Sequence, residues 1–363
     1  MKTICFFNST KAWGGGEKWH LEASSFLHER GYPVVVMAHR QSELYQRLPR
    51  AKLKCVAISI GNLSFLNPLK VRAISKELTK HNVGTVVMNG SRDLKAGGLA
   101  AKKAGVERII YRRGSAIPIK NSILNHYYFK HVVDEVLANS EATKNTVTAN
   151  NSSLFPKHKI KVIYNGIEID KILKGPAEPL YERKNPEKFV IVTLGRLELQ
   201  KNHFFLIGLA SELKRRKLEF EILIGGDGSL MEELNKAIKE EGLEHNIKLV
   251  GFIHKARNFI LSGDIFVLPS LWEGFGYVMA EAGLSKKPVI AFDCSSMPEV
   301  IDDGKTGFLV PVNDIKAFAD KVQYLLENPK KRSVMGENGF EFVRQKFDSK
   351  IIHEQVLNYL VHG

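Results

Sequence analysis

The chain has 363 residues, 44% of them hydrophobic and 25% charged, which is the composition of an ordinary globular protein. This length exceeds a usual single hydrophobic core, and no apolar run approaches the roughly 20 residues of a membrane-spanning helix, so we expect two domains and no transmembrane segment. The formal net charge is +14, and three widely spaced cysteines, without a CxxC or Cys/His cluster, suggest neither a disulfide framework nor a zinc site.

The positive charge lies almost entirely in the first half of the chain. Residues 1–180 contain 28 Lys and Arg against 13 Asp and Glu, whereas residues 181–363 contain 25 against 26. A basic half beside a neutral one suggests an anionic partner for the first half: a membrane surface, a phosphorylated glycolipid or a nucleic acid. A lysine-rich solvated surface is the alternative. Because no recognisable RNA- or DNA-binding module accompanies the charge, we expect no nucleic acid.

The first expected elements are a buried strand, a glycine-rich loop and a helix. Residues 4–7 are short, continuous and apolar, which is typical of a parallel strand. They lead through Gly14, Gly15 and Gly16 into an amphipathic segment that ends before residue 31. The apolar N-terminal run is too short for a signal peptide, so we expect a cytoplasmic protein. The loop has neither the GxGxxG fingerprint nor a P-loop lysine, which disfavours a nicotinamide dehydrogenase and a P-loop kinase.

A basic segment at residues 40–54 follows the strand expected at residues 33–38. It interleaves cationic and apolar side chains, as the helices that lie in a membrane interface do. The cations are Arg40, Arg47, Arg50, Lys52 and Lys54, and the apolar residues are Leu44, Tyr45 and Leu48. The same pattern also fits an ordinary amphipathic surface helix.

Two arginines stand at the end of another expected strand, residues 108–111. Ligands of parallel sheets bind beyond the carboxyl ends of strands, and the guanidinium fork pairs well with phosphate oxygens. Arg112 and Arg113 are therefore candidates for binding a phosphate-bearing ligand. The alternative is a structural ion pair with Asp93 or Glu141.

A linker is expected at residues 171–188, where Gly175, Pro176, Pro179 and Pro186 interrupt regular structure. The expected domains are therefore residues 1–170 and 189–344, followed by a helical segment at residues 345–363. From residue 189 onward, strands alternate with helical segments, which predicts a parallel doubly wound sheet.

Two cations follow the strand at residues 189–194. Arg196 and Lys201 at a strand's carboxyl end can neutralise a diphosphate. The next strand runs into a glycine turn containing Gly226, which allows a base or ribose to pack near the backbone.

The stretch EGFGYVMAEA follows the strand at residues 265–269 and carries Glu273 in a loop and Glu281 on the following helix. Gly274 and Gly276 let backbone N–H groups approach a ligand, and the start of a helix favours an anion such as phosphate. The alternative is a strand, loop and helix with two incidental carboxylates.

The order of these motifs resembles the retaining glycosyltransferases of family 4. The resembling residues are Glu273-x7-Glu281, the Gly-Arg-Leu at residues 195–197 with a lysine five residues after the arginine, and the Asn-Gly-Ile-Glu at residues 165–168. The resemblance implies the GT-B fold, an α/β architecture of two Rossmann-like doubly wound domains that face a central cleft. It also implies that the last helix returns to the first domain.

The resemblance further implies site residues. Glu281 would hydrogen-bond the donor ribose, and Glu273 would lie nearest the transferred sugar, beside Gly274, Phe275, Gly276 and Tyr277 at the sugar and diphosphate. Arg196 and Lys201 would stabilise the departing diphosphate, and the loop at Gly15 and Gly16 would let donor phosphate or acceptor approach the backbone. The family commonly has a histidine motif where this chain has Arg112 and Arg113, so no histidine role is assigned.

The expected reaction moves a sugar from a nucleoside-diphosphate sugar to an acceptor hydroxyl with retention of configuration. UDP-sugar is the first choice of donor and GDP- or ADP-sugar the second. No cofactor and no catalytic metal are expected, because no Asp-x-Asp signature stands near the diphosphate residues. The basic first half favours a phosphorylated glycolipid or lipopolysaccharide core as acceptor, with peripheral contact to an anionic membrane at the inner face of the cytoplasmic membrane. A transferase with a small soluble acceptor, a nucleotide-sugar epimerase and a non-enzymatic protein that binds anionic polymers are the alternatives.

Overall fold

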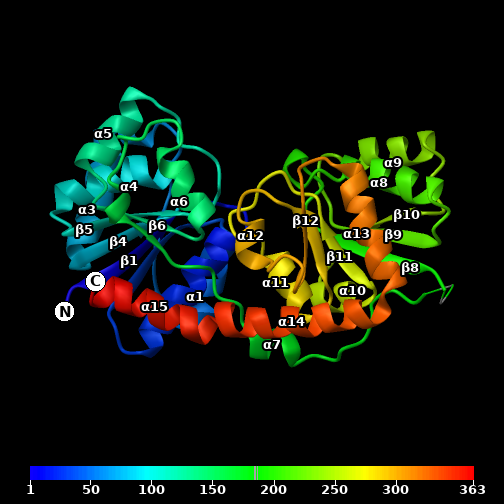
Figure 1. Ribbon diagram of the computed structural model, residues 1–363. Helices are drawn as coiled ribbons and strands as arrows, with labels where there is room; N and C mark the ends of the chain where they lie inside the picture. The colour runs from blue at the N-terminus through cyan, green and yellow to red at the C-terminus, as the bar shows by residue number, and fades with distance from the viewer. Residues whose placement is uncertain (184, 186) are drawn as a thin grey trace. The chain divides into compact units, whose positions relative to one another are not determined.

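The computed structural model describes residues 1–183, 185 and 187–363, and it forms two compact units (Figure 1). Unit 1 contains Met1–Gly166 and Lys350–Gly363, and unit 2 contains Ile167–Ser349. Residues 184 and 186 of the expected linker, Pro186 among them, lie outside the described residues. No helix in the part of the chain that the structure describes is long and apolar enough to cross a membrane.

Unit 1 is built on a seven-stranded parallel sheet in the order β3-β2-β1-β4-β5-β6-β7. The strand order reverses between β1 and β4, and this switch point is where open parallel sheets bind ligands. The strands are β1 (Thr3–Asn8), β2 (Val34–His39), β3 (Lys54–Ile58), β4 (Val83–Met88), β5 (Arg108–Arg113), β6 (Glu135–Ala138) and β7 (Ile160–Val162). The helices are α1 (Gly15–Glu29), α2 (Glu43–Arg47), α3 (Pro68–Lys80), α4 (Ser91–Ala104), α5 (Ile123–His131) and α6 (Glu141–Thr148), with short 3-10 helices η1 (Leu48–Ala51), η2 (Ser64–Leu66) and η3 (Lys157–Lys159).

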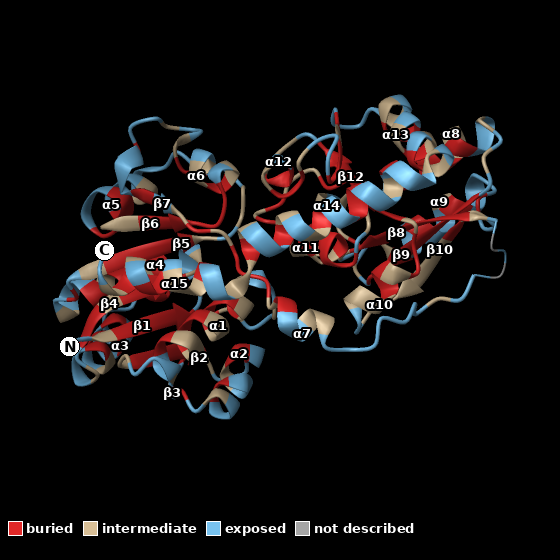
Figure 2. Cartoon of the chain, turned by 60° about the horizontal axis from the view of Figure 1, so that its bottom comes forward, coloured by how far each residue is buried: buried red, intermediate tan, exposed pale blue. Residues whose placement is uncertain are grey.

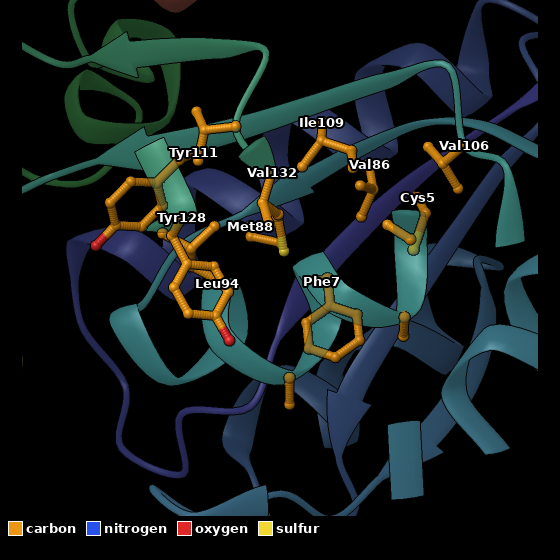
Figure 3. Close-up of a cluster of buried hydrophobic side chains, with 14 of the residues drawn as sticks. Cys5, Phe7, Val86, Met88, Leu94, Val106, Ile109, Tyr111, Tyr128 and Val132 are labelled. Carbon is orange, nitrogen blue, oxygen red and sulfur yellow. The ribbon is translucent and has the colours of Figure 1, made fainter. Parts of the chain in front are cut away.

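The two faces of this sheet are covered by separate apolar clusters. Successive side chains of a strand point to opposite faces, so Cys5 and Phe7 of β1 enter one cluster and Ile4 and Phe6 the other. Figure 3 shows the first cluster, in which strand side chains meet Leu94 of α4 and others from α5 and its end. Both faces are therefore buried, as a parallel sheet requires.

The C-terminal helix α15 (Ser349–Val361) belongs to unit 1 for most of its length. Ile352, Val356 and Leu360 are buried in the same cluster as Ile4 and Phe6. Polar contacts add to this packing: Arg108 Nη1 donates to the carbonyl of Tyr359, and the Tyr359 hydroxyl donates to Glu135, each at 2.7 Å. The end of the chain is thus part of the first core.

The basic segment at residues 40–54 does not form an interfacial helix. It folds as the five-residue helix α2, the 3-10 helix η1 and the start of the edge strand β3. Leu44 and Leu48 are completely buried in the cluster that contains Phe6. The interfacial interpretation is wrong because the apolar side chains of this segment fill the protein's own core.

Unit 2 is built on a six-stranded parallel sheet in the order β10-β9-β8-β11-β12-β13, which reverses between β8 and β11. Its strands are buried in the core except for the edge strand β10, which is mostly half-buried (Figure 2). They are β8 (Phe189–Leu194), β9 (Phe220–Gly225), β10 (Ile247–Gly251), β11 (Ile265–Leu268), β12 (Val289–Phe292) and β13 (Gly307–Val310). The helices are α7 (Ile169–Leu173), η4 (Leu199–Lys201), α8 (Phe204–Arg215), α9 (Met231–Glu240), α10 (Ala256–Leu261), α11 (Tyr277–Leu284), α12 (Met297–Val300), α13 (Ile315–Glu327) and α14 (Pro329–Phe347).

Candidate functional site

The carboxyl ends of β8 and β11 bring two of the expected residues into contact. Lys201 lies in η4 after β8, and Glu273 lies in the loop after β11. The Lys201 Nζ is 2.6 Å from Glu273 Oε1, and the side chains are only 14% and 8% exposed. Backbone bonds join the same loops, since Leu271 N–H donates to the Gln200 carbonyl at 2.9 Å. The switch point of unit 2 therefore holds a nearly buried ion pair.

Two serines that sequence reasoning did not assign hold the backbone of Glu273. The Glu273 N–H donates to Ser295 Oγ at 3.1 Å, and the Ser295 and Ser296 hydroxyls donate to the Glu273 carbonyl at 2.7 and 3.1 Å. Both serines follow β12, the next strand of the sheet. The signal in the sequence was the small-residue pair at a strand's carboxyl end.

The glycine loop between β11 and α11 contains both buried and half-buried residues. Gly276 has φ +83°, and a Cβ there would stand 2.3 Å from the Met279 methyl carbon. Phe275 is 2% exposed and packs on Phe347 at 5.0 Å between ring centroids, so its side chain belongs to the core and only its backbone can meet a ligand. Tyr277 begins α11, and it is half-buried, as are Gly274 in the loop and Glu281 on the helix.

A pocket of about 500 Å³ lies in unit 2 at the residues that follow β8, β9 and β10. It is lined by Arg196, by the glycine turn at Gly226 and by the side chain of Phe252, which is 67% exposed. Gly226 has φ +140°, and a Cβ there would stand 1.8 Å from the Gly195 carbonyl oxygen. The glycine is therefore required by the approach of two backbone segments. Arg196 is 72% exposed at its side chain and pairs with Glu198 at 3.0 Å.

Arg112, one of the two expected phosphate ligands, is buried in unit 1. It is 2% exposed, its guanidinium donates to Asn89 Oδ1 and Asn165 Oδ1 at 2.9 Å each, and it lies 4.3 Å over the ring of Trp19. The expectation that Arg112 binds a phosphate is wrong, because amide oxygens and an aromatic face enclose its charge within the core.

A polar network surrounds Arg112 at the switch point of unit 1. Asn8 Nδ2 donates to Glu17 Oε1 at 3.0 Å, and Glu17 is only 5% exposed. Gly15 begins α1, and a Cβ on Gly16 would stand 2.3 Å from Asn89 Nδ2. Burial, together with the Arg112 charge, lowers the pKa of His20 to about 3. Asn8, Glu17 and Asn89 were missed, although their position at strand ends and at a helix start marks them as candidates.

Arg113 lines a separate pocket of about 280 Å³ in the same unit. Lys95 and Lys120 also line it, together with Ser91, Ser122, Asn125 and apolar residues of α4, β5 and α5. The Arg113 Nη2 donates to the carbonyl oxygens of Ser115 and Ile117, which fixes the loop after β5. Three cations thus meet in one pocket.

The predicted site residues fall into two sets. Arg196, Lys201, Gly226 and Glu273, with the loop and helix that follow, lie in unit 2 at the carboxyl edge of its sheet. Gly15, Gly16, Arg112 and Arg113 lie in unit 1.

Two family models match consecutive parts of the chain. The model described as Glycosyltransferase Family 4 matches residues 13–171, and the model described as Glycosyl transferases group 1 matches residues 179–342. The alpha-D-kanosaminyltransferase of Streptomyces kanamyceticus is 32% identical over 171 residues, which are 46% of this chain and 44% of that protein. A Campylobacter jejuni enzyme, N-acetylgalactosamine-N,N'-diacetylbacillosaminyl-diphospho-undecaprenol 4-alpha-N-acetylgalactosaminyltransferase, is 29% identical over 66% of this chain and 64% of its own. The chain matches about half the length of the first of these relatives.

Solved structures resemble the whole chain. The Anabaena protein HepE in complex with UDP and glucose has a TM-score of 0.81 at 20% identity, with 99% of both chains covered. The apo form of the lipopolysaccharide outer core galactosyltransferase WaaB has a TM-score of 0.78 at 20% identity, with 99% of both chains covered. These likenesses concern the fold.

Proposed function

The chain belongs to the group 1, or family 4, glycosyltransferases and has their GT-B fold, as predicted, and from this premise we propose that it is a retaining, metal-independent enzyme. It transfers a sugar from a nucleoside-diphosphate sugar to an acceptor hydroxyl. The observation that carries this proposal is the Lys201–Glu273 pair, with Nζ and Oε1 2.6 Å apart, at the switch point of unit 2.

The donor lies in unit 2 in this proposal. The pocket at Arg196, Gly226 and Phe252 takes the nucleoside, and the exposed ring of Phe252 offers an apolar surface to a base. Glu281 of α11 accepts from the ribose hydroxyls. The complexes of HepE with UDP and with UDP-glucose support a UDP-sugar as the donor. GDP- and ADP-sugars are the alternatives.

Charge development explains the roles of the two cations. The bond between the anomeric carbon and the phosphate oxygen breaks, and negative charge collects on the departing diphosphate. The exposed Arg196 and the nearly buried Lys201 stabilise this charge. The acceptor oxygen attacks from the same face, and its proton passes to the departing phosphate oxygen, so that configuration is retained. Glu273, whose backbone is held by Ser295 and Ser296, stands nearest the sugar in this proposal.

The acceptor is a phosphate-bearing glycolipid or a lipopolysaccharide core in this proposal. Arg113, Lys95 and Lys120 meet in the 280 Å³ pocket of unit 1 and would bind a phosphate, whereas the buried Arg112 supports the fold around them. The Campylobacter relative is named for a diphospho-undecaprenol acceptor. The acceptor places the enzyme at the inner face of the cytoplasmic membrane, in peripheral contact with anionic lipid.

A panel of nucleotide sugars tests the donor proposal. The wild-type protein and a Glu281→Gln variant are screened for thermal stabilisation, and each sugar that stabilises is then assayed for nucleotide release with membrane glycolipid. We expect a UDP-sugar to stabilise the wild type, Glu281→Gln to weaken that effect, and release to require glycolipid. Conversion of the donor sugar without an acceptor would establish the epimerase instead. Turnover that a chelator abolishes and manganese restores would contradict the metal-free reaction.

A further inference from the structure

Three leucines project into solvent from the connection between β3 and α3 and from the first turn of α3. Leu63, Leu66 and Leu69 are 71%, 68% and 76% exposed. A single exposed leucine is ordinary, but three within residues 63–69 make an apolar patch, and such patches mark interaction sites. We call these three residues the leucine ridge.

The ridge has a fixed conformation. Gly61 N–H donates to Ser64 Oγ at 2.8 Å, and Asn67 Oδ1 caps α3 by accepting from the N–H groups of Leu69 and Lys70 at 3.0 and 3.1 Å. Ser64 is buried, and Phe65 packs against the core cluster. The leucines project because the residues between them anchor the segment, so the patch exists before any partner arrives.

Cations surround the ridge, and acids do not oppose them. Lys70 and Arg72 follow it as exposed residues of α3. Arg92 Nε donates to Asn62 Oδ1 at 3.2 Å, and Lys95 Nζ lies 5.6 Å from the centre of the Phe65 ring. Residues 61–76 contain neither Asp nor Glu.

Two acids near the ridge already have partners within the protein. Glu77 of α3, which lines a pocket together with Lys70, lies 3.7 Å from Lys80 Nζ and 3.6 Å from His81 Nε2. Asp93, beside Arg92, is 1% exposed and accepts hydrogen bonds from Ser9 and Gly90. Unit 1 as a whole contains 27 Lys and Arg against 11 Asp and Glu, a net charge of +16, whereas unit 2 contains 26 against 28. The ridge is therefore apolar, rigid and surrounded by uncompensated positive charge.

We propose that the leucine ridge and its cations dock unit 1 on the surface of an anionic phospholipid bilayer. The leucines enter the boundary between headgroups and acyl chains, and Lys70, Arg72 and Arg92 meet lipid phosphates. A second copy of this chain is disfavoured as the occupant, because two such faces would bring like charges together. The docking surface is thus the segment after β3, in place of the basic segment at residues 40–54.

The position of the ridge gives docking a use. It follows the carboxyl end of β3, and Lys95, which contacts Phe65, also lines the pocket of Arg113. Docking through the ridge would hold that pocket near the lipid headgroups, where a glycolipid acceptor presents its sugar. This use rests on the proposed function, but the docking itself does not.

Flotation with phosphatidylcholine vesicles, with and without phosphatidylglycerol, tests the proposal. The wild type is expected to float with the anionic vesicles, and added salt to weaken binding. Exchange of all three leucines for serine should lower the partition coefficient about 100-fold or more, and Lys70→Gln and Arg72→Gln about fivefold each. Val334→Ser, at a residue 56% exposed on α14 of unit 2, is the matched control and should float like the wild type.

Two further measurements separate the outcomes. Thermal unfolding and stabilisation by a nucleotide sugar should be unchanged in the leucine variant, so lost flotation with normal nucleotide binding reports docking alone. A protein that floats but binds no nucleotide sugar would sink the proposed function and leave docking intact. The docking proposal is overturned if the wild type stays unbound, if the leucine variant floats equally well, or if sedimentation reveals a dimer that the serine exchanges dissociate.

Discussion

Replacement of Lys201 by methionine removes one charge of the pair at the switch point of unit 2 and leaves an unbranched apolar side chain one atom shorter. At a separation of 2.6 Å, the attraction between Nζ and Oε1 is about 6 kcal/mol for an effective dielectric constant of about 20. Desolvation of the two charges offsets part of this attraction, and loss of one partner from a buried pair costs about 3–5 kcal/mol. Because the side chains are only 14% and 8% exposed, we expect Lys201→Met to lower the free energy of unfolding by about 3 kcal/mol.

The assay is urea unfolding of Lys201→Met, Glu273→Gln and the double variant. Removal of both charges leaves no uncompensated charge, so the double variant should be more stable than the sum of the single changes predicts, with a coupling energy of about 2–3 kcal/mol. The matched control is Lys236→Met, because Lys236 and Glu240 form an exposed pair on α9 with 3.7 Å between Nζ and Oε1. That change should cost less than about 0.5 kcal/mol. A coupling energy near zero for Lys201 and Glu273 would refute the reasoning.

Three other changes have expected outcomes. Arg196→Ala should alter the free energy of unfolding by less than about 0.5 kcal/mol, because the side chain is 72% exposed. The same change should lower kcat/KM at least about 100-fold. Steady-state rates near the wild-type values would disprove the role of Arg196. Arg112→Met should instead lower the free energy of unfolding by about 3 kcal/mol in urea titrations, because two amide oxygens lose their donor. An unchanged midpoint of urea unfolding would contradict the buried network. Burial, and then the Lys201 charge, lower the pKa of His203 from 6.5 to about 4. Between these two pH values the unfolded chain binds more protons at this histidine than the folded protein does. The free energy of unfolding therefore falls as the pH falls through that range. Urea titrations at pH 7 and pH 5 should differ by about 2 kcal/mol from this group, and His203→Leu should remove that part of the slope; equal slopes would exclude His203 as the cause.

Local patterns were sufficient for the two parallel sheets and for placing Lys201 and Glu273 at the same edge of the second sheet. Short apolar runs predicted β1, β8 and β11, since a strand buried on both faces needs continuous apolar sequence. The loops that follow such strands open at one edge, so Lys201 and Glu273 could be assigned to the same site although 72 residues separate them.

The failures share a cause, which is that burial depends on distant parts of the chain. Arg112 at a strand end looked available for phosphate, but its charge is enclosed by Asn89 and Asn165, which are 23 and 53 residues away. Leu44 and Leu48 have the spacing of an interfacial helix, and only the packed core shows that they face inward. Neither outcome can be read from spacing, because spacing defines a face and not what covers it.

The configuration of the transferred sugar tests the central claim most directly. The purified protein is incubated with an α-linked nucleoside-diphosphate sugar identified by the stabilisation screen and with its glycolipid acceptor, and the anomeric coupling constant of the product is measured by proton NMR. The account predicts an α-linked product that Arg196→Ala forms far more slowly. A β-linked product, or an α-linked product formed equally fast by that variant, would contradict it.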